Sequence, residues 1–156
     1  MALAKCLSWR LPERISSPAD VAGLRVRASS EAVARVLAGL GAKPTILNRH
    51  DVIMGQLASR ELDGIVTNWG NPLPQFDSLL RYHTDVPISA PAFFVLMNRA
   101  RYISLPTEVR DAIDALSGRQ WSRQIGRLWN VWDDQVRERS LANGSEIITP
   151  DASTMQ

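Results

Sequence analysis

The sequence predicts an α/β fold, one lobe with a short parallel sheet, followed by a long C-terminal helix. Three observations point to it. The 156 residues are 45% hydrophobic and 22% charged, which suits one domain with a buried core. From Ala22 to Val66, short apolar runs alternate with amphipathic stretches, the pattern of βαβ units. From Pro106 onwards, apolar residues recur at three- and four-residue steps, as on one face of a helix.

The first strand of the predicted sheet is Gly23–Arg27. Leu24 and Val26 alternate with Arg25 and Arg27 along it. Because side chains alternate between the two faces of a strand, the apolar pair would face one side and the two arginines the other. The sequence therefore predicts a strand with one apolar and one basic face.

Two further strands and two helices follow in alternation. The serines at 29–30 offer an N-cap for the first helix, and Gly41 is placed to end it in a left-handed conformation. Residues 44–47 are a second strand candidate, 51–59 a short helix and 64–66 a third strand. Three parallel strands joined by two crossover helices are the simplest arrangement of these elements.

The second half of the sequence has fewer regular signals. Residues 68–74 contain glycine and two prolines and predict a loop, whereas 92–97 form the most apolar run, for which we expect a buried strand. Pro106 opens a long helix that breaks at Ser117–Gly118 and continues with a tryptophan-rich face, which must pack on something. Residues 146–148 are a candidate for one more short strand.

Composition excludes several kinds of site. The net charge is +2, the sequence pI is near 9.1, and Lys5 and Lys43 are the only lysines, so the basic field is too weak to indicate nucleic-acid binding by itself. The one cysteine, Cys6, excludes an intrachain disulfide and a cysteine-cluster metal site. The segment from Met1 to Leu11 lacks the continuous apolar core of a secretory signal peptide. We therefore expect no export signal in this chain.

Seven short segments, in order along the chain, carry a family resemblance that extends from about Ile15 to about Trp132. The segments are Ser17–Arg27 (SPADVAGLRVR), Leu40–Pro44 (LGAKP), Leu62–Gly64 (LDG), Asn68–Trp69, Arg81–Thr84 (RYHT), Val95–Asn98 (VLMN) and Ser104–Pro106 (SLP). Together they make the chain resemble the substrate-binding receptors of tripartite ATP-independent periplasmic (TRAP) transporters, the dicarboxylate-receptor or DctP-like family. One departure is Ala28, where family members often carry proline.

The resemblance implies an α/β lobe of the periplasmic binding-protein type, joined to a partner lobe by a crossing strand and the long helix. Family members carry a full lobe and a signal sequence before the Asp-x-x-Gly-Leu segment, so we expect the second half of a receptor. We expect an irregular segment at 1–14, the lobe with its hinge strand and long helix at 15–145, and a C-terminal tail at 146–156. The resemblance also implies a periplasmic location and TRAP membrane permease subunits as partners.

Arg27 is the residue to which the resemblance gives a ligand-binding role, a bidentate salt bridge to the carboxylate of the substrate. The chemistry suits that role, because a planar guanidinium presents parallel N–H donors to both carboxylate oxygens. The end of a strand in an open α/β sheet is also where such sheets bind ligands. The alternative is an ordinary surface contact. If Arg27 binds the ligand, Arg27→Ala in a full-length receptor should remove most of the affinity while the fold melts nearly unchanged.

Four more residues are candidates for ligand binding. Trp69 follows the third predicted strand and would form an apolar wall of the cleft, or else be an ordinary packing tryptophan. Thr67 and Asn68 would offer hydrogen bonds beside it. Arg49 follows the second predicted strand at the corresponding edge, where a solvated arginine is the plainer interpretation.

Other functions have less support. Arg119, Arg123 and Arg127 recur every four residues and would form a basic stripe, which suits a nucleic-acid or protein interaction module or simply a solvated helix face. His50 and His83 have no metal-ligand spacing and no nucleophile motif accompanies them. We therefore expect no metal, no cofactor, no catalysis and no nucleic acid. A homodimer through the tryptophan-rich helix is a further alternative.

Overall fold

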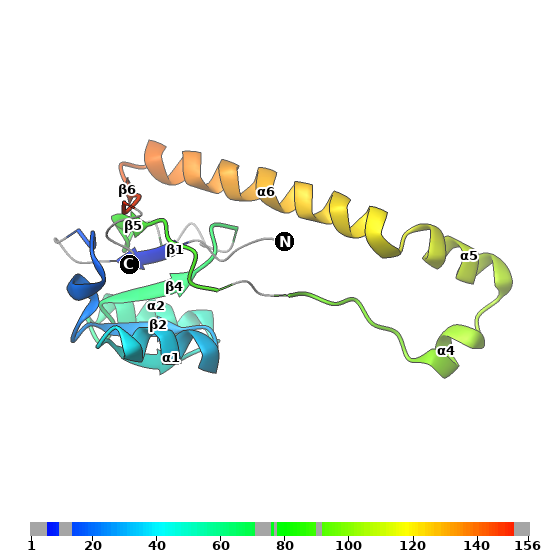
Figure 1. The fold of residues 1–156 in the computed structure, drawn as a ribbon, viewed down its shortest axis with the longest axis horizontal. Coiled ribbons are helices and arrows are strands. Elements are labelled where there is room, and N and C mark those ends of the chain that lie inside the picture. The colour runs from blue at the N-terminus through cyan, green and yellow to red at the C-terminus, as the bar shows by residue number, and fades with distance from the viewer. Residues whose placement is uncertain (1–5, 10–13, 71–75, 77, 90–91, 152–156) are drawn as a thin grey trace.

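The structure is a computed structural model, and it describes residues 6–9, 14–70, 76, 78–89 and 92–151. These residues form a mixed six-stranded sheet in the order β3-β2-β4-β1-β5-β6, helices beside it, and a long arm. In Figure 1 the sheet and its helices lie at one end, while α6 and an extended segment run side by side away from it. No helix in the part of the chain that the structure describes is long and apolar enough to cross a membrane.

Three parallel strands with two crossover helices form the βαβ part of the fold that sequence analysis predicted. A 3-10 turn at Pro18–Val21 (η1) leads into β2 (Arg25–Ala28), which is followed by α1 (Glu31–Gly39), β3 (Lys43–Ile46), α2 (His50–Ala58) and β4 (Gly64–Thr67). The strand β2 lies between β3 and β4 and is parallel to both. Ser30 caps α1 by accepting from the backbone N–H of Val33, and Gly41 has φ +81°, as expected for a left-handed residue after the helix.

The two faces of these strands carry separate cores. On the α1 side, Val26 and Ala28 of β2 are buried with Val33 and Leu37 of α1. On the α2 side, the buried cluster holds Ile53, Leu57, Leu62, Ile65, Phe76 and Leu80. The strand β2 alternates as predicted, with Val26 and Ala28 buried, Arg25 exposed and Arg27 half-buried. Its two arginines therefore face the α2 side.

The first strand, β1 (Cys6–Trp9), lies in the middle of the sheet, which corrects the expectation of an irregular segment at 1–14. It pairs antiparallel with β4 on one side and with β5 (Tyr82–Thr84) on the other. The sequence around Cys6 has little strand pattern, so pairing with distant partners determines this strand. The predicted strand at 146–148 is confirmed as β6 (Glu146–Ile148), which pairs parallel with β5.

A buried strand at 92–97 was predicted and is wrong for this chain. Residues 92–98 are extended but form no strand, and the side chains of Phe93 to Met97 are exposed by between 53% and 99%. A strand needs a partner strand to satisfy its backbone groups, and the described residues supply none here. The arm continues through α4 (Arg99–Ile103), α5 (Thr107–Ala115) and α6 (Gly118–Ala142), with the predicted break before Gly118.

Of the predicted loop at 68–74, residues 71–74 lie outside the described residues. The preceding residues Asn68, Trp69 and Gly70 are described, and they form no helix or strand. They follow directly on β4, so this short segment starts at the edge of the sheet where the parallel strands end.

Candidate functional site

Arg27 lies at the carboxyl edge of the three parallel strands. It is on β2, and its side chain donates to a backbone carbonyl of each neighbouring strand end. Nε donates to the carbonyl oxygen of Leu47, which follows β3, at 2.7 Å, and Nη1 donates to that of Val66 in β4 at 2.9 Å. A longer contact of 3.5 Å joins Nη2 to Oδ1 of Asn48. The guanidinium therefore bridges both flanking strands at their common edge.

The Arg27 guanidinium keeps donors for a further partner. A guanidinium carries five N–H donors, and the contacts with Leu47, Val66 and Asn48 use three of them, which leaves two without a partner among the residues that the structure describes. Within the described ranges it forms no ion pair with a carboxylate. Burial lowers its pKa from the usual value, but an arginine stays charged at any pH that proteins meet. A half-buried cation without a counter-ion is a suitable partner for an anionic ligand.

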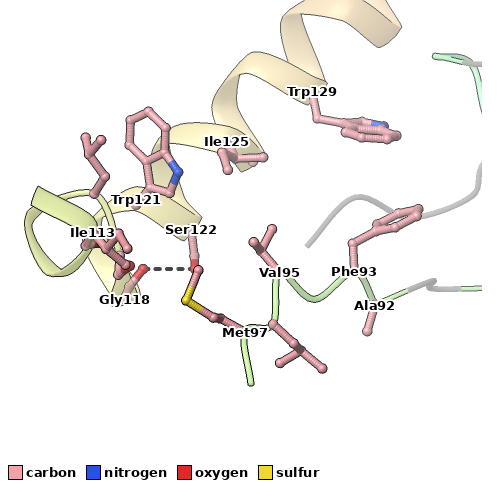
Figure 2. A pocket seen from close by; sticks show the side chains of 14 residues that line it. Ala92, Phe93, Val95, Met97, Ile113, Gly118, Trp121, Ser122, Ile125 and Trp129 are labelled. Atoms are coloured by element: carbon pink, nitrogen blue, oxygen red, sulfur yellow. Dashed lines mark hydrogen bonds between the residues drawn. The ribbon is translucent and has the colours of Figure 1, made fainter. Parts of the chain in front are cut away.

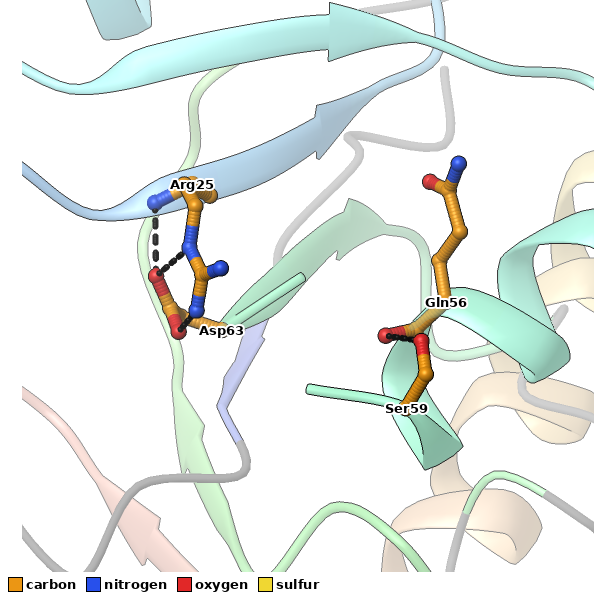
Figure 3. A network of polar contacts seen from close by, with 4 residues as sticks. All are labelled: Arg25, Gln56, Ser59 and Asp63. Atoms are coloured by element: carbon orange, nitrogen blue, oxygen red, sulfur yellow. Dashed lines mark hydrogen bonds and ion pairs between the residues drawn. The ribbon is translucent and has the colours of Figure 1, made fainter. Parts of the chain in front are cut away.

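Arg25, two residues earlier on the same face, is in contrast fully paired. Asp63 accepts from its backbone N–H at 2.8 Å, from Nε at 3.0 Å and from Nη2 at 2.6 Å (Figure 3). The hydrogen bond from Arg25 is the main cause that lowers the pKa of Asp63 below its ordinary value. Asp63 directly precedes β4, so this pair lies at the amino end of the strands, away from the carboxyl edge.

Trp69 is packed inside the molecule. Its side chain is 4% exposed and contacts Val136 of α6 and Ile147 of β6. Its indole N–H donates to Oδ1 of Asp85 at 3.3 Å. This is the packing role that sequence analysis left open, and a role as a wall of the ligand cleft stays a prediction.

The remaining candidates lie at or near the same edge. Thr67 ends β4 and Asn68 follows it, and both are half-buried. Arg49 is exposed and donates from Nη2 to Oδ2 of Asp51 in the first turn of α2 at 2.5 Å. The structure therefore brings Arg27, Thr67 and Asn68 to one edge, whereas Arg49 already has a carboxylate partner.

The other polar features have structural neighbours. His50 meets Phe76 edge to face at 6.3 Å between ring centroids, and His83 is buried beside Trp69 at 5.3 Å. Among the residues that the structure describes, no group of three His, Cys, Asp or Glu side chains gathers to hold a metal ion. The residues of the basic stripe are all exposed on α6.

A hollow of about 740 Å³ lies away from Arg27, between the extended segment and helices α5 and α6. Figure 2 shows Phe93, Val95 and Met97 on one side of it and Trp121, Ile125 and Trp129 on the other. Phe93 stacks on Trp129 with ring centroids 5.3 Å apart. The lining is mainly apolar and the side chains of the extended segment are largely exposed, so this surface is suited to being covered by protein rather than to binding a carboxylate.

Sequence reasoning missed the groups that hold Arg27. Two of them are backbone carbonyls, at Leu47 and Val66, and every residue has a carbonyl, so no residue type marks them. The signal that was available is their place, because carboxyl ends of parallel strands meet at one edge. The tryptophan-rich face of the last helix predicts that it packs on something, but no signal in the sequence identifies Trp69 as a partner of that helix.

The family model described as bacterial extracellular solute-binding protein, family 7, matches residues 12–156. A search of the curated proteins returned no match. Two solved structures at 27% identity are similar. A marine-metagenome TRAP solute-binding protein specific for aromatic acids, in complex with metahydroxyphenylacetate, has a TM-score of 0.85 and covers 98% of this chain and 49% of its own. One from Rhodoferax ferrireducens T118 with copurified benzoate has a TM-score of 0.80, covering 96% of this chain and 48% of its own.

A third structure shows likeness of fold at lower identity. It is a TRAP periplasmic solute-binding protein from Pseudomonas aeruginosa PAO1 with bound L-malate, 21% identical, with a TM-score of 0.81 over 97% of this chain and 52% of its own. The chain thus spans about half the length of the structures it matches. The predicted fold class, a periplasmic binding protein-like lobe, is confirmed.

Proposed function

Because this chain belongs to family 7 of the bacterial extracellular solute-binding proteins, we propose that it captures an organic carboxylate through Arg27 for TRAP-type transport across a membrane. The proposed role is binding without catalysis. The captured solute would pass to TRAP membrane permease subunits, and the place of action would be the periplasm.

The arrangement of Arg27 is the observation that supports this proposal. Its guanidinium is held by carbonyls of two strand ends, is half-buried, and keeps two N–H donors. Binding a carboxylate to an arginine that is already oriented costs less side-chain conformational entropy than binding it to an arginine that must first be ordered. Thr67 and Asn68, at the end of the neighbouring strand, would complete the polar side of the site.

Aromatic monocarboxylates are the first ligands to test. The structures at 27% identity are named for aromatic acids and benzoate. One guanidinium also neutralises one carboxylate, and Arg25 and Arg49 are each engaged by an aspartate. On this lobe, the second carboxylate of a dicarboxylate ligand would therefore need a cation other than these three arginines.

A second lobe would close over the ligand. We propose that residues 15–145 act as the lobe with its connecting parts, and that the apolar segment Phe93–Met97 and the upstream half of α6 face the second lobe. The strands β1 and β6, which lie outside that range of residues, complete the sheet of this unit. The long exposed apolar surface supports this division, because surfaces of that size are normally covered. Ligand binding would shift the population towards the closed state.

Titration of the full 156-residue chain with benzoate, succinate and L-malate tests the proposal, with the arginine Nε–H resonances followed by NMR. With one side of the site open to water, we expect a Kd no better than about 1 mM, which corresponds to a binding free energy of about 4 kcal/mol in magnitude. Arg27→Lys keeps the charge but loses the planar fork, so it should lose most of the binding. Arg35→Lys, an exposed arginine on α1, is the matched control and should bind as the wild type does.

Two outcomes would contradict the proposal. One is a chain that gives no saturable shift with any of the three acids up to about 50 mM, well above the expected Kd. The other is an Arg27→Lys variant whose titrations match those of the Arg35→Lys control.

A further inference from the structure

The short segment after β4 is held by the long helix α6 as well as by the sheet. The end of β4 directly before it takes part in the proposed site, since the carbonyl of Val66 accepts from Arg27, and Thr67 and Asn68 follow. Its last described residues, Trp69 and Gly70, both contact α6. The first helix contact, at Trp69, is therefore only three positions after Val66, the acceptor of Arg27.

A three-residue cluster holds Trp69. Its indole N–H donates to Oδ1 of Asp85, and Nη2 of Arg137 on α6 lies 3.5 Å from Oδ2 of the same carboxylate. The guanidinium carbon of Arg137 lies 5.9 Å from the centroid of the Trp69 ring, within cation–π range. Val136, also on α6, is buried against Trp69. One face of the helix thus fixes this side chain through both charge and packing.

A second contact is made by the backbone of Gly70. The indole N–H of Trp132 on α6 donates to the carbonyl oxygen of Gly70 at 2.7 Å. A Cβ at position 70 would lie 2.7 Å from Oδ1 of Asp133 and 2.8 Å from Cδ1 of Trp132, so a larger residue there would force these side chains to shift. The contacts come from two successive turns on one side of α6, at residues 132, 133, 136 and 137, so they form one continuous contact surface.

We propose that Trp132 is a positioning residue for the carboxylate site, acting through Gly70 on Asn68 and on the end of β4 that carries the Val66 carbonyl. This inference rests on the proposed function of Arg27. The α6 helix is a single unbroken element, and its amino-terminal part projects away from the sheet (Figure 1). Its orientation at the sheet therefore sets where the segment after β4 lies, and with it one of the two carbonyls that orient Arg27.

The test compares Trp132→Phe with Trp121→Phe in the full chain. The first keeps an aromatic ring but removes the N–H that Gly70 accepts, and the second changes a tryptophan of the same helix that lines the apolar hollow instead. Three quantities are measured: the melting temperature, the chemical shift of the Arg27 Nε–H without ligand, and the Kd for benzoate. We expect Trp132→Phe to shift the Arg27 resonance and to weaken benzoate binding about threefold, and Trp121→Phe to change neither. Gly70→Ala disturbs the same contact from the other side and should move the same resonance.

If Trp132 contributes only to stability, Trp132→Phe should lower the melting temperature. The Arg27 resonance and the Kd, measured at 15 °C, well below melting, should then equal those of the Trp121→Phe control. That result would overturn the inference while leaving the proposed function intact. If the wild-type chain shows no Arg27-dependent binding, the proposed function fails, and the ligand-free Arg27 resonance still decides whether Trp132 positions this side chain. An unchanged resonance in both Trp132→Phe and Gly70→Ala would then refute the coupling.

Discussion

Arg27→Met is expected to destabilise the fold in the absence of any ligand. The substitution leaves the carbonyl oxygens of Leu47 and Val66 without their donor. A hydrogen bond from a charged donor contributes about 1.5–3 kcal/mol, and the removal of a desolvated guanidinium offsets part of two such losses. We therefore expect a net loss of about 2 kcal/mol in the free energy of unfolding. Sequence reasoning expected Arg27→Ala to melt nearly unchanged, and the two carbonyl contacts revise that expectation.

Thermal unfolding followed by circular dichroism measures this effect. For a chain of 156 residues, a loss of about 2 kcal/mol corresponds to a melting temperature about 4–8 °C lower. Arg35→Met, which changes an exposed arginine on α1 in the same way, should melt within about 1 °C of the wild type. An Arg27→Met chain that melts together with this control would show that water satisfies both carbonyls and that they do not orient the guanidinium.

Two further predictions concern charge and exposed apolar surface. The pKa of Asp63 is lowered in the folded chain, chiefly by Arg25, so its carboxylate stabilises the fold above the ordinary pKa of 3.8, and this stability is lost as the pH falls through the lowered folded pKa. Asp63→Asn should therefore reduce stability at pH 7 and flatten the acid limb of a curve of stability against pH. An unchanged acid limb would contradict this. Leu96 is 86% exposed on the arm, so we expect the chain to self-associate through that apolar surface, as measured by light scattering. Leu96→Glu should reduce the association without changing the melting temperature. Equal scattering by both chains would place the contact elsewhere.

The three-stranded parallel unit could be predicted from sequence because its signals are local. The alternation of Val26 with Arg25 and Arg27, the serine cap and the left-handed Gly41 each act within a few residues, and all appear in the structure. The strand β1 could not be predicted in the same way, because only its partners on β4 and β5, far along the chain, determine it.

The prediction for 92–97 failed for the opposite reason. The apolar sequence of Phe93 to Met97 is that of a segment buried on both faces, and the residues described here do not supply a sheet to bury it. The sequence indicates burial correctly but does not say by which segment. The candidate site was predicted in part, since Arg27 follows from its strand and its family segment, whereas the carbonyls that hold it depend on how three strand ends meet.

The position of β1 makes the two parts of the sheet depend on a few backbone hydrogen bonds. In the order β3-β2-β4-β1-β5-β6, the strand β4 reaches β5 only through Cys6–Trp9. Other links between the two parts are the contacts of α6 with the segment after β4 and with β6, and side-chain contacts such as that of the Thr84 hydroxyl with the carbonyl oxygen of Ile15. Loss of β1 would turn one continuous sheet into a three-stranded and a two-stranded piece with newly exposed edges, joined by α6 and by side-chain contacts but not by strand pairing. Such edges readily add strands from other molecules. An amino-terminal tag or truncation that disturbs these four residues would therefore promote aggregation even with every residue of the proposed site in place.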